Sequence, residues 1–398
     1  MSDSTILSQV AFGYSPLIDR QRSVMATRLT VFPMRQDATI NAGALLEALA
    51  QVWPAGGASV SLNVASETLL VDLMAARPAS NVMIEVPAFM AGDAANAEAL
   101  GQLYAAGNKL LIKGRPVNAL PREVLPFFKY SIIELADDRR SSEAQVPAGV
   151  QRSIAFVQSG VRTLADLEAS FQRGAAAVIG WPIDDAIGTG RGGKPMRPDM
   201  QIMVELIRRL DEGDEIDRLE DTLKRDPTLA FRLLRYINSP AFGLRVEVSS
   251  FRHAIMLLGY QKLKRWLALL LATAGQDANL RPVMYAAVRR GLLMEELVRN
   301  STDETMRGEV FICGVFSLLD KMLGRPFEEL LKSLPVPANV YEALARSDGP
   351  HRPLLDLVLA IESESIYDIR DAAERLLLGP GEINRAILRA LQSAAALD

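Results

Sequence analysis

The stretch from residue 158 to residue 183 reads QSGVRTLADLEASFQRGAAAVIGWPI, and it decides the fold expected for the N-terminal half. An apolar strand ends at Gly160, Thr163 begins an amphipathic helix, and a second apolar strand ends at Trp181. Thr163 and Asp166 have the spacing of a capping box. One face of the helix is apolar and consists of Leu164, Leu167 and Phe171. This strand–loop–helix–strand unit is typical of an α/β barrel.

The same alternation extends back to the N-terminus. Eight short runs rich in Val, Ile and Leu predict strands at 10–14, 24–32, 58–64, 81–86, 109–113, 130–135, 153–158 and 176–181. Helical patterns lie at 44–53, 66–76, 94–106, 120–128 and 163–172. The first two strands have no helix between them, which predicts an antiparallel hairpin, and residues 136–149 are too polar and too few for a full barrel helix. We therefore expect a degenerate (β/α)8 barrel over residues 1–187.

The C-terminal half has a different pattern. Residues 188–198, GTGRGGKPMRP, lack periodicity and the spacing of a phosphate-binding loop, so we interpret them as a linker. From residue 199 onward, apolar residues recur at i, i+3 and i+4, and this spacing predicts an all-helical domain over 199–398. The expected fold class is thus α/β plus all-α.

Composition limits the classes of function. Apolar residues make up 49% of the 398 residues, and the net charge of −4 gives no reason to expect a nucleic-acid partner. The N-terminus lacks a signal-peptide pattern, and the longest apolar run, 266–274, is too short to span a bilayer. The single cysteine, Cys313, fits a reducing compartment and is expected to be a buried, unreactive thiol. We expect a cytoplasmic protein without a membrane partner.

Only two histidines occur, which excludes a His-rich metal centre or a Cys/His zinc site. His253 is expected near the start of a helix, hydrogen-bonded or partly exposed. His351 lies in the turn-rich segment SDGPHRP and is expected to be solvated.

One run of the C-terminal half carries short motifs that identify a family. These motifs are Asp226-Pro227, Leu233-Leu234, Asn238-Ser239, Phe242-Gly243, Ala254-Ile255 and Leu258-Gly259. They resemble the HDOD family, a helical domain related in fold to HD-type metal-dependent phosphohydrolases, over roughly residues 199–320. HD enzymes bind metal through a His-Asp pair, and the matching positions here hold Ser317 and Leu318. The resemblance therefore implies a domain without the metal dyad.

A barrel followed by such a domain resembles the bacterial EAL–HDOD signalling proteins. Active EAL barrels hydrolyse cyclic di-GMP with Mg²⁺ or Mn²⁺ held by acids at the strand ends. Arg28 stands where that family places a metal-binding Glu, while Asn63 and Glu85 match two ligand positions by type. Lys113 lies in a strand that should carry acids. Ser159 and Arg162 replace both glutamates of a further loop motif.

We therefore expect a non-catalytic signalling or adaptor protein without a cofactor, which acts through protein–protein contacts made chiefly by the HDOD domain. A second hypothesis is an atypical phosphodiesterase that uses Asn63, Glu85, Glu134 and the pair Asp137-Asp138. A third is a cyclic di-GMP sensor, in which basic side chains converge on phosphates at the barrel mouth. The basic residues of the third hypothesis are Arg28, Lys113, Arg115 and Arg162.

Overall fold

The computed structural model describes residues 6–35, 39–116, 119–138, 154–185, 198–223, single positions between 252 and 268, 281–333 and 336–395. By their internal contacts the residues divide into two compact units. The barrel unit comprises Met1–Asp185 and Leu359–Leu388, and the helical unit comprises Ala186–Val358 and Arg389–Asp398.

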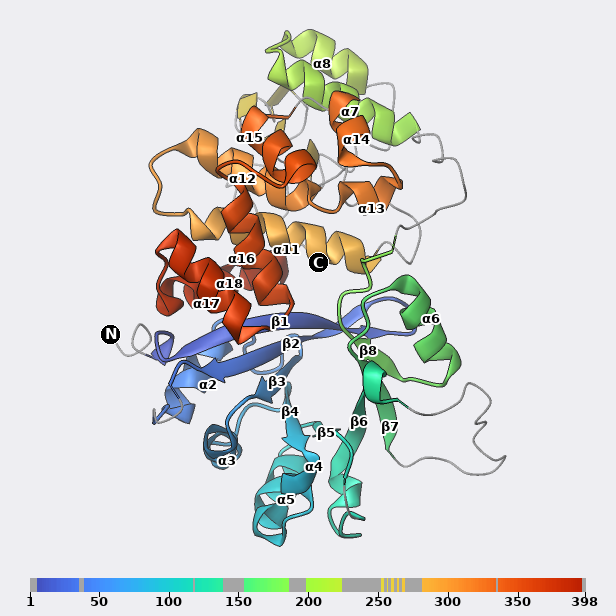
Figure 1. The fold of residues 1–398 in the computed structure, drawn as a ribbon, viewed down its shortest axis with the longest axis vertical. Helices are drawn as coiled ribbons and strands as arrows, with labels where there is room; N and C mark the ends of the chain where they lie inside the picture. The colour runs from blue at the N-terminus through green and yellow to red at the C-terminus, as the bar shows by residue number, and fades with distance from the viewer. Residues whose placement is uncertain are drawn as a thin grey trace. The chain divides into compact units, whose positions relative to one another are not determined.

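A closed eight-stranded barrel forms the core of the barrel unit (Figure 1). Strand β1 is antiparallel to both β2 and β8, and the remaining neighbours pair in parallel. All eight predicted strands and the predicted hairpin are confirmed. The strands are β1 (Val10–Asp19), β2 (Val24–Pro33), β3 (Val60–Val64), β4 (Val82–Pro87), β5 (Leu110–Lys113), β6 (Phe128–Glu134), β7 (Ala155–Ser159) and β8 (Ala177–Ile179).

Short helices connect several of these strands. They are α2 (Ala42–Ala50), α3 (Glu67–Ala75), α4 (Ala88–Ala91), α5 (Ala97–Ala105) and α6 (Leu164–Gln172). Thr163 caps α6 as predicted, because its side chain accepts a hydrogen bond from the backbone N–H of Asp166. The helix predicted at 120–128 is wrong, and only a 3-10 turn forms at Leu125–Phe127. Pro126 lacks a backbone donor and disfavours the helical conformation of the residue before it.

The barrel unit also contains a distant segment of the chain. Residues 359–388 comprise the end of α16 (Arg352–Glu362), all of α17 (Ile366–Leu376) and the beginning of α18 (Pro380–Ala395), and α17 lies beside β1 (Figure 1). The side-chain oxygen of Asn384 accepts from the N–H of Phe12 at 3.1 Å, and its amide donates to the carbonyls of Leu7 and Val10, both at 2.7 Å. The division by internal contacts assigns residues 359–388 to the barrel unit, whereas the sequence pattern placed all of 199–398 in one helical domain.

The helical unit is all-α over its described residues. Its helices are α7 (Pro198–Asp211), α8 (Ile216–Leu223), α11 (Arg281–Leu297), α12 (Glu304–Phe316), α13 (Leu319–Leu323), α14 (Phe327–Ser333), α15 (Ala338–Tyr341) with the π-helical turn Glu342–Arg346, the beginning of α16 and the end of α18. Glycines let α11 and α12 approach closely, since a Cβ on Gly314 would lie 2.6 Å from the backbone nitrogen of Gly291. Within the described part of the chain, no helix is both long and apolar enough to cross a membrane. Residues 188–197 of the predicted linker lie outside the described residues.

Candidate functional site

A layer of apolar side chains fills the middle of the barrel. It comprises Leu17, Ala26, Met83, Leu111, Ile132, Val157, Ala177 and Ile179. Side chains two positions apart on a strand point to the same face. On the parallel strands β2, β4, β5, β6 and β7, the residue two positions after the member of the apolar layer, toward the carboxyl end, therefore also points into the barrel. Those positions are polar. They are Arg28, Glu85, Lys113, Glu134 and Ser159, and Ser15 occupies the corresponding place on antiparallel β1.

Arg28 and Glu85 form a bidentate ion pair at the centre of this polar layer. The guanidinium donates from Nε to Glu85 Oε1 at 2.7 Å and from Nη2 to Oε2 at 2.8 Å, and Ser61 donates to Oε1 at 3.2 Å. The side chain of Glu85 is 0% exposed and that of Arg28 is 10% exposed. Burial lowers the pKa of Arg28, but the charges of Glu85 and Glu364 outweigh it and raise that pKa above its ordinary value. Arg28 is therefore a fixed cation.

A second carboxylate joins the pair from the C-terminal segment. Glu364 lies between α16 and α17, and its Oε2 accepts from Arg28 Nη1 at 2.6 Å and from the Thr30 hydroxyl at 2.8 Å. Its Oε1 accepts from the Ser15 hydroxyl at 2.5 Å. Residues 336 positions apart in the sequence thus meet in one buried network.

The network continues along the mouth of the barrel. Lys113 donates from Nζ to Asn63 Oδ1 at 2.6 Å, and the Asn63 amide donates to Thr30 Oγ1 at 3.0 Å. Burial lowers the pKa of Lys113 below 10.5, partly opposed by the charge of Glu85. On the far side, Ser159 donates to Glu134 Oε2 at 2.7 Å. Gly160 has a φ of 75°, and a Cβ there would collide with the Glu134 carboxylate.

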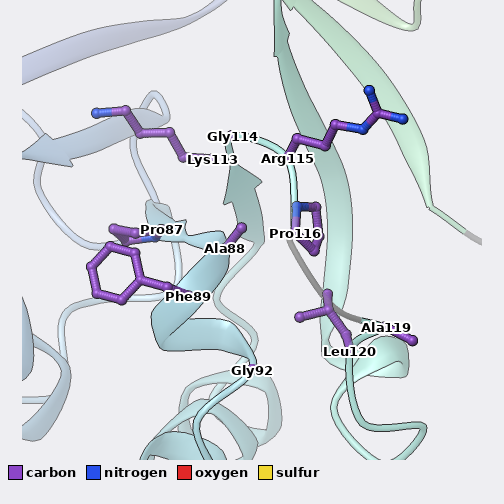
Figure 2. A pocket seen from close by; sticks show the side chains of 10 residues that line it. All are labelled: Pro87, Ala88, Phe89, Gly92, Lys113, Gly114, Arg115, Pro116, Ala119 and Leu120. Atoms are coloured by element: carbon purple, nitrogen blue, oxygen red, sulfur yellow. The ribbon is translucent and has the colours of Figure 1, made fainter.

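Three of the four basic residues proposed to meet phosphates, Arg28, Lys113 and Arg115, line one cavity, and Arg162 is not in its lining. Arg28 and Lys113 are engaged inside the barrel. The Arg162 side chain is 70% exposed and pairs with Asp184 at 2.7 Å. Figure 2 shows Lys113 and Arg115 extending to opposite sides of Gly114. The structure therefore brings together Arg28, Asn63, Glu85 and Lys113 from the predicted set, together with Ser159 on the same inner face, and leaves Arg162 outside.

The described mouth does not fit the divalent metal that the EAL resemblance implies. Both oxygens of Glu85 accept from Arg28, and the Asn63 oxygen accepts from Lys113, so the two matching ligand positions are already bonded to cations. A metal ion bound there would have to displace the Arg28 guanidinium from Glu85. Over the described residues, no group of three or more His, Cys, Asp or Glu side chains could hold a metal.

Two cavities open beside the network. One, of about 460 Å³, is lined by Arg28, Lys113, Arg115, Glu134, Asp137, Asp138 and Ser159 with neighbouring backbone and apolar groups. The other, of about 620 Å³, lies between α4 and the end of β5, where Phe89, Leu120 and Lys113 line it (Figure 2). The first contains three of the four acids of the phosphodiesterase hypothesis, Glu134, Asp137 and Asp138, alongside basic side chains, so its lining is mixed in charge.

Ser317 and Leu318, which the resemblance matched to the HD dyad, lie in the helical unit at the end of α12. Ser317 donates to the carbonyl of Gly314 at 2.7 Å and accepts from Arg290 Nη1 at 3.1 Å. Leu318 is buried. Among the predicted HDOD motif residues, Gly259 has a φ of 73°, a left-handed conformation that glycine adopts readily. Asp226, Pro227, Asn238 and Ser239 lie outside the described residues.

His351 and Cys313 are buried in the helical unit, whereas His253 is partly exposed. His351 is 2% exposed, so the expectation of a solvated side chain is wrong. Its Nε2 lies 2.8 Å from Glu309 Oε2, a partner on α12 that the turn-rich local sequence did not indicate. His253 is partly exposed in a helix, as predicted. Burial raises the pKa of the Cys313 thiol to about 12.

Sequence reasoning missed four members of the network. Ser15, Thr30 and Ser61 lie at inward-facing positions, and the alternation along each strand could have identified them. Glu364 had no comparable signal, because it reaches the barrel from a helical segment with no sequence pattern linking it to Arg28.

Residues 195–324 match the HDOD domain family, as the motif spacing predicted. The chain therefore combines a closed eight-stranded barrel with an HDOD domain, the order of domains found in EAL–HDOD signalling proteins.

Two curated relatives are similar to parts of the chain. The uncharacterized protein YuxH of Bacillus subtilis is 31% identical over 166 residues, a match that covers 40% of each chain. A Vibrio cholerae protein named cyclic di-GMP phosphodiesterase CdgJ is 28% identical over 193 residues, covering 45% of this chain and 44% of the relative. The matches thus span less than half the length of both relatives.

Among solved structures, the phosphodiesterase PaMucR in complex with c-di-GMP covers 44% of this chain and 91% of its own. Its sequence identity is 19% and the TM-score is 0.34.

Proposed function

We propose that this protein is a non-catalytic signalling adaptor linked to cyclic di-GMP signalling, in which the barrel does not hydrolyse the nucleotide and the HDOD domain binds a protein partner. The link to this nucleotide is supported by the similarity to CdgJ and by the resemblance to EAL–HDOD proteins. The observation that carries the proposal is the bidentate Arg28–Glu85 pair, 2.7 and 2.8 Å in length, at the centre of the barrel mouth.

The chemistry of that pair argues against hydrolysis. A metal-dependent phosphodiesterase needs carboxylate oxygens free to bind cations that activate water and neutralise phosphate. In the described mouth, Glu85 instead neutralises Arg28, and Asn63 accepts from Lys113. Releasing Glu85 would leave a guanidinium buried without its partner, at a cost of about 3–5 kcal/mol.

The helical unit supports the same proposal. In the position of the HD dyad, Ser317 hydrogen-bonds to Arg290 and to a backbone carbonyl, and Leu318 packs in the core. Neither side chain provides the imidazole or carboxylate that an HD metal needs. An HDOD domain of this kind is suited to binding another protein rather than to catalysis.

The test is nucleotide turnover by the full chain. Purified protein at high concentration is incubated with cyclic di-GMP and either Mg²⁺ or Mn²⁺, with an active EAL phosphodiesterase as positive control, and products are separated by chromatography. We expect no linear dinucleotide above the protein-free blank. Turnover that disappears in Glu85→Ala would overturn the proposal in favour of the atypical phosphodiesterase.

A nucleotide sensor is the second candidate, because the cavity of about 460 Å³ holds Lys113 and Arg115 at the mouth. Calorimetry with cyclic di-GMP distinguishes the two functions. Saturable binding without turnover, weakened at least tenfold by Arg115→Ala, would favour the sensor. Absence of heat at tens of micromolar protein would favour the adaptor.

The adaptor also requires a partner. A photo-crosslinking residue placed at Met256, which is 66% exposed in the HDOD region, should trap one defined protein in cells that express the full chain. The same residue placed at Tyr104, which is 51% exposed on the barrel unit, is the matched control. No specific adduct at either position, together with cyclic di-GMP binding, would reject the adaptor.

A further inference from the structure

Three donors converge on the carboxylate of Glu364. Oε2 accepts from Arg28 Nη1 at 2.6 Å and from Thr30 Oγ1 at 2.8 Å, and Oε1 accepts from Ser15 Oγ at 2.5 Å. Ser15, Arg28 and Thr30 are 4%, 9% and 2% exposed. One guanidinium and two hydroxyls, all directed at two oxygens of one anion, form a set of donors typical of an oxyanion site.

The backbone is built to bring Glu364 to these donors. A Cβ on Gly13 would lie 3.0 Å from the Glu364 Cα and 3.0 Å from the Ile361 carbonyl, so the absent side chain makes room for the segment. Glu364 has a φ of 54°, a left-handed conformation that non-glycine residues rarely adopt. Beside it, the Trp181 indole donates to the Glu362 carbonyl at 3.2 Å and holds the end of α16 in place. Together, these features fix the position of the Glu364 carboxylate.

We propose that Ser15, Arg28 and Thr30 form an oxyanion site whose occupant in this structure is Glu364, an internal ligand that competes with external carboxylate or phosphate groups. The inference goes beyond the adaptor function and holds whether or not the barrel hydrolyses a nucleotide. The two other nitrogens of the Arg28 guanidinium donate to Glu85, so the guanidinium stays in position when Glu364 leaves.

The proposal has a consequence for access to the mouth. The three donors to Glu364 lie on β1 and β2. One of them, Arg28, also lines the cavity of about 460 Å³, together with Lys113 from β5 and Ser159 from β7. A ligand that reaches from the cavity to the oxyanion site must displace Glu364. Because Glu364 is tethered, its effective concentration is high, on the order of millimolar or above, and external anions compete poorly in the unmodified protein.

The experiment measures anion binding by the full chain. Isothermal titration calorimetry is run at constant ionic strength with inorganic phosphate and, separately, with formate. The variants are Glu364→Ala, Glu364→Gln and the control Glu374→Ala, which removes an exposed carboxylate from the same segment. We expect Glu364→Ala to bind at least one anion saturably, at least tenfold more tightly than the unmodified protein and the control. Adding Arg28→Met to Glu364→Ala should abolish that binding.

Two safeguards keep the test decisive. Trp181 fluorescence and circular dichroism verify that each variant is folded; if Glu364→Ala is not, Glu364→Gln is used, since it keeps the side chain's size and loses the charge. Binding of formate alone identifies a carboxylate-bearing ligand, and binding of phosphate alone a phosphate-bearing one; either supports the site. Absence of saturable binding to the folded variant, or equal binding by the unmodified protein, overturns it.

Discussion

Replacing Arg28 by methionine tests whether the buried ion pair organises the barrel mouth. Methionine has a similar length and keeps the packing, but it removes both bonds to Glu85, whose side chain is 0% exposed, and the bond to Glu364, whose side chain is 15% exposed. A buried carboxylate left without its cation costs about 3–5 kcal/mol. The barrel should therefore lose about that much free energy of unfolding at neutral pH.

Native-state hydrogen exchange measures this loss within the barrel itself. The slowest amides of β2, β3 and β4 report the opening free energy, and each 1.4 kcal/mol is a tenfold change. Their protection should fall by about two to three and a half powers of ten. The control is Arg162→Met, because that side chain is 70% exposed and its partner Asp184 is 45% exposed. Exposed ion pairs contribute little to stability, so the opening free energy of the control should differ from that of the unmodified protein by less than about 1 kcal/mol.

A double variant separates an unpaired charge from a general loss of packing. Arg28→Met combined with Glu85→Leu replaces the pair by apolar side chains, which is often neutral for stability. The double variant should recover most of the protection that Arg28→Met loses. A single variant that loses less than about 1 kcal/mol, or a double variant no more stable than the single one, would refute the reasoning.

Three further substitutions or reactions test other features. Gly160→Ala should lower the free energy of unfolding by about 1–3 kcal/mol, because the new Cβ meets Glu134 at a positive φ, whereas Gly56→Ala, at a φ of 78° in open space, should lose only about 1 kcal/mol in chemical denaturation. Burial raises the pKa of Cys313 to about 12, so iodoacetamide at pH 8 should alkylate the native thiol at least ~10-fold more slowly than the denatured one; equal rates would contradict the burial. Burial lowers the pKa of Lys113 below 10.5, so the unfolded chain binds more protons and stability rises with pH toward 10.5. Lys113→Met should flatten that rise, which is measured as unfolding free energy between pH 8 and 10.5.

Local patterns were sufficient for the barrel. Strands β1 to β8 each carry an apolar run bounded by polar or turn residues, and Thr163 marks the start of α6 by capping chemistry that depends only on its neighbours. The pattern failed at residues 120–128, where apolar spacing suggested a helix and Pro126 prevented one. The spacing of apolar residues alone does not show that a proline lacks the backbone N–H that a helix needs.

The candidate site was predictable only in part. Arg28, Asn63, Glu85 and Lys113 could be placed on one inner face, because their strands and the alternation of side chains are readable from sequence. The hydrogen-bond and ion-pair partners of the site residues could not all be predicted from the sequence. Glu364 comes from a segment whose helical pattern gives no indication of which surface it covers, and His351 is buried by a contact with Glu309 that its own turn-rich neighbourhood does not predict.

The discontinuous barrel unit also bears on how the chain is synthesised. Arg28 and Glu364 are 336 residues apart, so at roughly 5–20 residues per second a ribosome makes the second about 20–70 s after the first. The Arg28–Glu85 pair can form early in translation, but Ser15, Thr30 and the start of β1 acquire Glu364 and Asn384 only after residues 186–358 have been made. Glu364 and Asn384 thus reach the barrel only after the residues that match the HDOD domain have been made.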